Sequence, residues 1–145
     1  MKTLIIIPAY NEEKNIKEVI DNVSREKPHA KILVIDDGSS DRTSPIVKET
    51  KKADIVTLPH NLGIGGAVQT GFKYAHRNNY DVVVRVDGDG QHRADQIKKI
   101  LHPVLHQEAN IVIGSRFLGI PTRYPHFIRR TGQKVISSLI LLLTR

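Results

Sequence analysis

Short apolar runs alternate with amphipathic segments along most of this chain, and this alternation restricts the fold more than any other feature. The runs are rich in Val, Ile and Leu, which is typical of strands buried on both faces of a sheet. Five such strands are predicted: Thr3–Ile7, Lys31–Ile35, Asp54–Leu58, Tyr80–Val86 and Asn110–Ile113.

The segments between the runs have the spacing of helices. The first, Glu12–Arg25, carries a single apolar stripe: Ile16, Val19, Ile20 and Val23. A second helix opens with Ser44 as N-cap and Pro45 as first helical residue, and a third follows a Gly-rich turn. The fourth contains Pro103, which is expected to kink or end it. The expected bounds are Ser44 to about Lys52, a turn over Asn61–Gly66 with a helix to about Asn78, and Ala94–Gln107. This order predicts an α/β fold, with a mostly parallel sheet and helices on both faces.

The C-terminal stretch differs in character. Ile120–Phe127 contains two prolines and is expected to be a loop, and Ile128–Arg145 a helix with an apolar core over Val135–Leu143. That core is far shorter than the ~20 residues that span a bilayer. An acceptor-side or interface helix is therefore expected, and exposure of its apolar face predicts a homo-oligomer. An apolar helix at this point suggests one domain over residues 1–145 that is truncated at its C-terminus.

Composition excludes several classes of protein. The absence of cysteine excludes disulfides and thiolate metal sites, and the apolar start is too short for a signal peptide, so a cytoplasmic setting is expected. The net charge of +7 favours anionic partners. From Arg116 to Arg145 there is no acid, which indicates contact with phosphate or with the inner membrane surface. With 5% aromatic residues and no binding motif, nucleic acid is the least favoured partner.

Polar residues follow four of the predicted strands. Carboxyl ends of parallel strands share one edge of a sheet, where ligands of α/β proteins bind. Each segment taken alone is compatible with an ordinary turn or helix cap, and Asp41 is interpreted as such a cap. The segments are Pro8–Glu12, Asp36–Asp41, Asp87–Asp89 and Gly114–Arg116.

The segment after the fourth strand predicts a metal site. Asp87, Asp89 and Gln91 supply two carboxylates and an amide oxygen, which suit Mg²⁺ or Mn²⁺ completed by substrate phosphates. This indicates an enzyme that handles a diphosphate. The glycines of Asn61–Gly66 fit neither a P-loop nor a dinucleotide fingerprint, so they are interpreted as structural, as is Gly71.

Taken together, the motifs resemble the family 2 glycosyltransferases of GT-A (Rossmann-like) fold. The motif Gly114–Phe117 resembles that of the branch that includes dolichyl-phosphate mannose and polyprenyl-phosphate glucose synthases. The matching segments are Pro8–Glu12, Asp36–Asp41, Asn61–Gly63 with Ala67 and Gly71, Asp87–Gln91, and Gly114–Phe117.

The resemblance implies a role for each matching residue. Asp89 and Arg116 would be catalytic, Arg116 as a phosphate clamp, and Arg129 or Arg130 would contact acceptor phosphate. The metal ligands would be Asp87, Asp89 and Gln91. The nucleotide-sugar pocket would be lined by Pro8, Ala9, Tyr10, Glu12, Asp36, Asp37, Asp87 and Gly88.

The resemblance implies sugar transfer, with inversion, from a UDP- or GDP-linked donor. A lipid-phosphate acceptor needs no general base, and the absence of acids after Arg116 favours it. Three alternatives stay open. They are a polysaccharide or O-antigen glycosyltransferase with a hydroxyl acceptor, a sugar nucleotidyltransferase, and a non-catalytic nucleotide-sugar-binding fragment.

Overall fold

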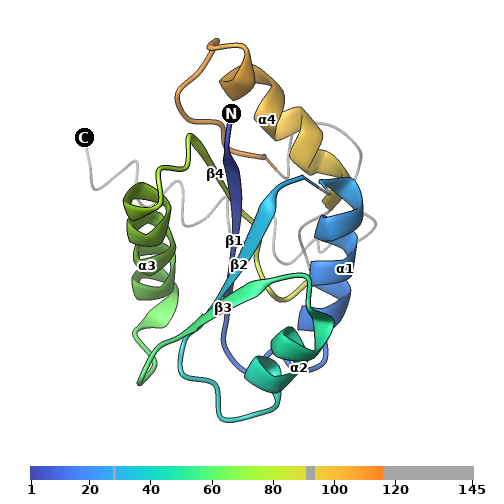
Figure 1. Cartoon of the computed structure of the whole chain (residues 1–145), viewed down its shortest axis with the longest axis vertical. Coiled ribbons are helices and arrows are strands. Elements are labelled where there is room, and N and C mark those ends of the chain that lie inside the picture. Colours follow the sequence, from blue (N-terminus) through green and yellow to red (C-terminus); the bar gives the residue numbers. More distant parts are fainter. Residues whose placement is uncertain (28, 91–93, 116–145) are drawn as a thin grey trace, which may run out of the picture. The chain divides into compact units, whose positions relative to one another are not determined.

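Four parallel strands form one sheet in the order β3-β2-β1-β4 (Figure 1). The computed structural model describes residues 1–27, 29–90 and 94–115, and Met1–Ile113 form one structural unit. The predicted parallel sheet is confirmed. Its strands are β1 Thr3–Ala9, β2 Lys31–Asp36, β3 Asp54–Thr57 and β4 Val82–Arg85.

Helices cover both faces of this sheet, as the sequence predicts. In Figure 1, α3 lies on one side of the strands and α1 and α4 on the other. None of the helices in the described ranges combines the length and apolar composition that crossing a bilayer requires. Their bounds are α1 Ile16–Glu26, α2 Thr43–Thr50, α3 Gly63–Arg77 and α4 Ile97–Leu105, the last preceded by a 3₁₀ turn over Ala94–Gln96.

The apolar core has two layers, one on each side of β1. Ile5 and Ile7 face α1, α2 and α4, whereas Leu4 and Ile6 face α3, and all four side chains are fully buried. The predicted stripe of α1 is buried in the first layer. At the rate of about 25 cal/mol per Å² of buried apolar area, a central strand with two covered faces is a principal source of stability.

Four helix starts differ from the sequence predictions. α1 begins at Ile16 rather than Glu12, because residues before it are drawn towards the next loop by side-chain hydrogen bonds. Ser44 is not the N-cap of α2: it lies inside the helix, and its hydroxyl donates to Asp36. α3 begins at Gly63, so the Gly-rich segment is mostly helical rather than a turn. α4 begins at Ile97 rather than Ala94 and ends at Leu105, two residues after Pro103, in line with the expected early end.

The predicted fifth strand over Asn110–Ile113 is wrong for the described structure. Residues 111–115 have no regular structure, and Ile111 and Ile113 are 80% and 86% exposed. A strand exists only where a neighbouring edge accepts its hydrogen bonds, and a four-residue apolar run carries no information about that partner. The predicted loop 120–127 and helix 128–145 lie outside the described residues.

Gly38 and Gly65 provide a test of this backbone. Gly38 has φ of 74°, and a Cβ added there would lie 2.8 Å from the carbonyl carbon of His60. We expect Gly38→Ala to lower the free energy of unfolding by about 2–4 kcal/mol, because the left-handed backbone and the clash both oppose a side chain. Urea denaturation measures this change.

Gly65→Ala is the matched control. Gly65 lies in the first turn of α3 with no atom within 4 Å of an added Cβ. Alanine there should stabilise the protein by about 0.5 kcal/mol through its higher helix propensity. Equal urea midpoints for the two variants would contradict the described turn at Gly38.

Candidate functional site

A pocket lies at the carboxyl edge of the sheet, where β1, β2 and β4 end and α3 begins. Its cavity volume is about 300 Å³, at the lower end of the range for small-molecule sites. The sequence-predicted segments after these three strands all contribute to it. The lining residues are Pro8, Ala9, Tyr10, Glu12, Asp37, Asn61, Gly63, Ile64, Ala67, Arg85, Asp87, Gly88 and Asp89.

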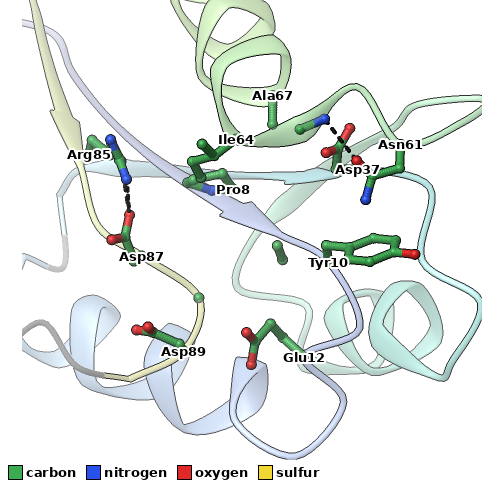
Figure 2. A pocket seen from close by; sticks show the side chains of 13 residues that line it. Pro8, Tyr10, Glu12, Asp37, Asn61, Ile64, Ala67, Arg85, Asp87 and Asp89 are labelled. Carbon is green, nitrogen blue, oxygen red and sulfur yellow. Dashed lines mark hydrogen bonds and ion pairs between the residues drawn. The ribbon is translucent and has the colours of Figure 1, made fainter.

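The lining divides into two chemically different ends. Figure 2 shows Tyr10, Asp37 and Asn61 together on one side, and Arg85 and Asp87 on the other. The Tyr10 side chain is 48% exposed, so its ring is available to a ligand. The pocket therefore joins an end with an aromatic ring, an amide and one carboxylate to an end with an arginine–aspartate pair.

Asp37 fixes the first of these ends. Its side chain is only 3% exposed, and its Oδ1 accepts a hydrogen bond of 2.8 Å from the Leu62 N–H. The neighbouring Asn61 Oδ1 accepts from the Gly63 N–H at 2.8 Å. The first bond holds the start of α3 against the end of β2, and the second shapes the turn into the helix. Ile64 and Ala67 thereby lie in the pocket wall (Figure 2).

Asp36 lies outside the lining of the pocket. It is 1% exposed, and both carboxylate oxygens are engaged: Oδ1 accepts from the Ser39 N–H at 3.0 Å and Oδ2 from the Ser44 hydroxyl at 2.6 Å. These bonds organise the turn after β2. Direct contact between Asp36 and a nucleotide stays a prediction.

The Asp87-Gly88-Asp89 turn packs tightly against the end of β1. A Cβ added to the buried Gly88 would lie 3.0 Å from the Pro8 carbonyl oxygen, so the close approach of the two backbones favours glycine. Asp87 is partly buried, and Asp89 is exposed at the rim. The turn thus carries both carboxylates along one side of the pocket.

Sequence reasoning did not assign a site role to Arg85. Its Nε and Nη2 contact Asp87 Oδ1 at 2.9 Å and 2.7 Å (Figure 2). Alternation along the strand puts residues two apart on the same face. An arginine two positions before Asp87 in an otherwise apolar strand was therefore the signal. Four other lining residues were assigned by sequence reasoning to a structural turn and its packing: Asn61, Gly63, Ile64 and Ala67.

The carboxylates fit a hard divalent cation only in part. Oxygen donors are the ligands that Mg²⁺ and Mn²⁺ prefer, and Asp87 and Asp89 supply them from one turn. In residues 1–27, 29–90 and 94–115, no three or more acidic, His or Cys side chains form a metal-binding group. A cation here would need further oxygens, such as those of a ligand's phosphates. Gln91, Arg116, Arg129 and Arg130 lie outside the described residues.

Residues 4–138 match the family described as Glycosyl transferase family 2. This chain belongs to that family. It is 38% identical over 128 residues to a UDP-N-acetylglucosamine–dolichyl-phosphate N-acetylglucosaminyltransferase of Methanococcus voltae, covering 77% of this chain and 51% of the relative. It is 35% identical over 122 residues to a polyprenol monophosphomannose synthase of Mycolicibacterium smegmatis, covering 81% and 46%. The family 2 chain spans about half the length of these curated relatives.

Solved structures of glycosyltransferases have the same architecture. The glucosyl-3-phosphoglycerate synthase of Mycobacterium tuberculosis, in complex with Mn²⁺, UDP-glucose and phosphoglyceric acid, has a TM-score of 0.62 and 26% identity, covering 74% of this chain and 40% of that chain. A mannosyltransferase of Pyrobaculum calidifontis with GDP-Man and Mn²⁺ has a TM-score of 0.56 and 25% identity, covering 66% and 29%. The GT-A fold and the resemblance to the dolichyl-phosphate sugar branch are confirmed.

In this family 2 chain, the loops after β1 and β2 are joined by reciprocal hydrogen bonds, here called the loop latch. Asn11 has φ of 54°; its N–H donates to Ser39 Oγ at 2.9 Å, and its Oδ1 accepts from the Ser40 N–H at 2.9 Å. The remaining bonds of the loop latch run from the Glu12 N–H to Thr43 Oγ1 at 2.8 Å, from the Glu13 N–H to Asp41 Oδ2 at 3.0 Å, and from the Arg42 N–H to Glu13 Oε2 at 3.1 Å.

The loop latch fixes the backbone on both sides of Glu12, and so positions two pocket residues, Tyr10 and Glu12.

Asp41 has the cap role that the sequence predicted, since its Oδ1 accepts from the Thr43 N–H at 2.9 Å. Burial alone would raise the pKa of the Asp41 carboxyl, but hydrogen bonds from Thr43 and the Glu13 N–H outweigh burial, and the pKa lies below its usual value.

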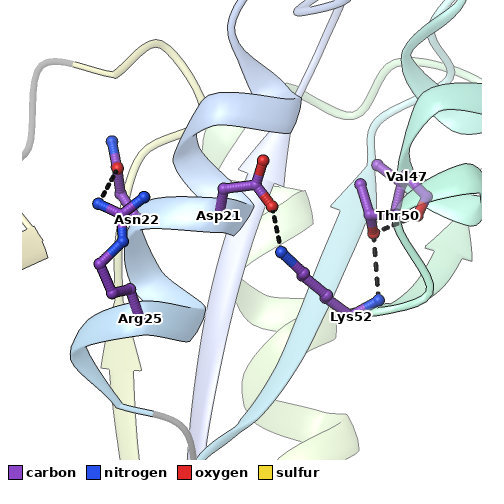
Figure 3. Close-up of polar contacts among 6 residues, drawn as sticks. All are labelled: Asp21, Asn22, Arg25, Val47, Thr50 and Lys52. Carbon is purple, nitrogen blue, oxygen red and sulfur yellow. Dashed lines mark hydrogen bonds and ion pairs between the residues drawn. The ribbon is translucent and has the colours of Figure 1, made fainter.

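A second contact joins the helices that follow these loops. Lys52 Nζ, just after α2, donates to Asp21 Oδ1 of α1 at 2.6 Å (Figure 3). This hydrogen bond lowers the pKa of Asp21. Lys52 is itself held by its N–H, which donates to Thr50 Oγ1 at 3.2 Å. The two loops and the two helices behind them are therefore connected at two separate places.

The loop latch predicts a pH-dependent contribution to stability. We expect Asp41→Asn to lower the free energy of unfolding by about 1–2 kcal/mol near pH 7, because charge-assisted bonds are lost. The folded-state pKa of Asp41 is lowered, so its stabilisation is present above the unfolded pKa of about 3.9 and is lost as the pH falls through the folded-state pKa. Urea unfolding of wild type and Asp41→Asn, at pH 7 and at acidic pH, measures how the difference in stability changes with pH.

Asp54→Asn is the control for this experiment. Asp54 forms a surface ion pair of 2.9 Å with Lys31, and both side chains are about half exposed. Such pairs contribute about 0–1 kcal/mol. A difference between wild type and Asp41→Asn that stays unchanged as the pH falls through the acid limb, down to full protonation of the carboxylates, would contradict the role of the Asp41 carboxylate.

Proposed function

We propose that this chain is the donor-binding part of a glycosyltransferase that transfers a sugar from a nucleoside diphosphate to polyprenyl or dolichyl phosphate. One observation carries the proposal: the pocket joins Tyr10 and Asp37 at one end to Asp87 and Asp89 at the other. The curated relatives bear names of enzymes that act on dolichyl phosphate and polyprenol. Both solved neighbours were crystallised with a nucleotide sugar and Mn²⁺.

The nucleoside would occupy the end of the pocket near Tyr10. An exposed aromatic ring can stack on a base, and a carboxylate accepts from a ring N–H, which both uracil and guanine possess. Asp37 is held rigidly by the Leu62 N–H, so its carboxylate is preorganised for that contact. Glu12 lines the same pocket and would accept from the ribose hydroxyls.

Charge explains why a divalent metal belongs to this proposal. The described lining contains four carboxylates, those of Glu12, Asp37, Asp87 and Asp89, against one guanidinium. A diphosphate would meet net repulsion there without a cation. When bound, Mg²⁺ or Mn²⁺ would neutralise the charge that develops on the departing nucleoside diphosphate. Asp87 and Asp89, with Gln91 as predicted from the sequence, would hold it.

The acceptor is the second part of the proposal. A phosphate acceptor is already an anion, so no general base is required for in-line attack with inversion. Arg116, Arg129 and Arg130 are the predicted phosphate contacts. A lipid phosphate would bring the enzyme to the inner face of the membrane, with the basic C-terminal stretch nearest to it.

Donor binding tests the proposed site directly. We expect UDP or GDP with Mn²⁺ to raise the melting temperature of the chain, since a ligand at about 100 times its Kd adds about 2.7 kcal/mol of stability. Asp37→Asn should weaken nucleotide binding about tenfold with or without metal. Asp89→Asn should abolish only the part of the shift that depends on Mn²⁺.

Glu49→Gln is the matched control, because Glu49 is an exposed acid of α2 that pairs with Arg42 at 3.5 Å and lies outside the pocket. It should bind as wild type does. If neither nucleotide shifts the melting temperature of the wild-type chain at any metal concentration, the donor-site proposal is wrong.

The acceptor is tested by following labelled sugar from UDP- and GDP-linked donors into polyprenyl phosphate with the intact protein. We expect a lipid-linked product whose formation requires Mn²⁺ or Mg²⁺, because the diphosphate must be neutralised as it leaves. Transfer to a glycan hydroxyl with no lipid product would favour the polysaccharide alternative. Release of free sugar without transfer would favour the binding-fragment alternative.

A further inference from the structure

We propose that Arg85 couples metal binding to donor binding: its guanidinium neutralises Asp87 while the donor site is empty and turns to the donor diphosphate when one binds. The inference rests on the proposed function and adds to it a residue that links metal to nucleotide. It starts from one geometric fact. Nε and Nη2 of Arg85 both approach the same oxygen, Asp87 Oδ1, at 2.9 Å and 2.7 Å.

The Arg85–Asp87 ion pair places a permanent positive charge next to Asp87, one of the metal ligands proposed above. A guanidinium is always protonated, so it competes with a divalent cation for Asp87 Oδ1 and repels that cation at short range. The metal alone should therefore bind weakly. The competition ends only when the guanidinium finds another anion.

A donor diphosphate is such an anion. Arg85 and Asp87 line the same pocket as Tyr10 and Asp37, so a nucleotide held at one end brings its phosphates towards the other. The Arg85 side chain is 43% exposed, which leaves its head group room to turn. The planar fork of arginine pairs with two phosphate oxygens as well as it pairs with a carboxylate.

The position of Arg85 in β4 supports this role over a structural one. Val82, Val84 and Val86 point into the core layer beneath α1 and α4, and Val83 packs on the side of α3. Arg85 follows Val83 on that side, beside the start of α3, and is the one cation among the described lining residues. A purely structural role would not explain why a cation stands in a pocket wall that contains four carboxylates.

The test measures two affinities in opposite directions. Mn²⁺ alone is titrated by the electron paramagnetic resonance signal of the free ion, and UDP and GDP are titrated by calorimetry at saturating Mn²⁺. In Arg85→Gln we expect Mn²⁺ alone to bind about three- to tenfold more tightly, and the nucleotide about tenfold more weakly. Arg85→Lys retains the charge, so Mn²⁺ alone should bind as in wild type while the nucleotide loses part of its affinity.

Arg77→Gln is the matched control for charge. Arg77 is an exposed residue in the last turn of α3, about 20 Å along the helix from the pocket end, and its removal should leave both affinities unchanged. The proposal is overturned if Arg85→Gln leaves both affinities unchanged or moves them in the same direction. In the latter case Arg85 only maintains the shape of the turn.

The outcome is separable from that of the proposed function. If wild type shows nucleotide binding that depends on Mn²⁺ and Asp87→Asn loses it, the donor site stands whatever Arg85→Gln does. If wild type shows no such binding with either nucleotide, the proposed function fails first.

Discussion

The hydrogen bonding of β1 on both edges is the constraint on which the rest of this structure depends. It pairs in parallel with β2 on one side and with β4 on the other, and its side chains are buried on both faces. Because the three strands run in one direction, the chain leaves each of them at the same edge. Polar segments that are far apart in sequence are thereby brought to one pocket. Ala9 lies opposite Asp36 in the ladder, and the Val86 N–H donates to the Ile6 carbonyl at 3.0 Å.

The sequence predicts that four strand ends meet at the site, and three of them line the pocket. The fourth, Gly114–Arg116, follows a segment that is not a strand, and Gly114 and Ser115 are not among the lining residues. Runs of β-branched residues mark the first four strands, and the rule that parallel strands end at one edge places Tyr10, Asp37, Asp87 and Asp89 together. The sequence was not sufficient to decide between neighbours. Asp36 and Asp37 are chemically identical and adjacent, yet the first is engaged by Ser39 and Ser44 and the second lines the pocket. That outcome depends on the path of the backbone at the end of β2.

Contributions from helices and edges were the least predictable. Ile64 enters the pocket wall because α3 begins at Gly63, and the start of that helix is held by the Leu62 N–H, which donates to Asp37, 25 residues earlier in the chain. Asn110–Ile113 has the composition of a strand, but strand formation requires a partner that the sequence does not identify. Both differences have one origin: local patterns report local preference, whereas these features are decided by contacts between segments distant in the chain.

Within residues 1–27, 29–90 and 94–115, every residue that lines the pocket lies between Pro8 and Asp89. On the proposed function, the donor contacts that the structure describes are therefore encoded in one uninterrupted stretch of the gene. On that same function, exchange of downstream sequence between related genes would retain these donor contacts, so that enzymes with unlike products could inherit one ancestral donor-binding segment.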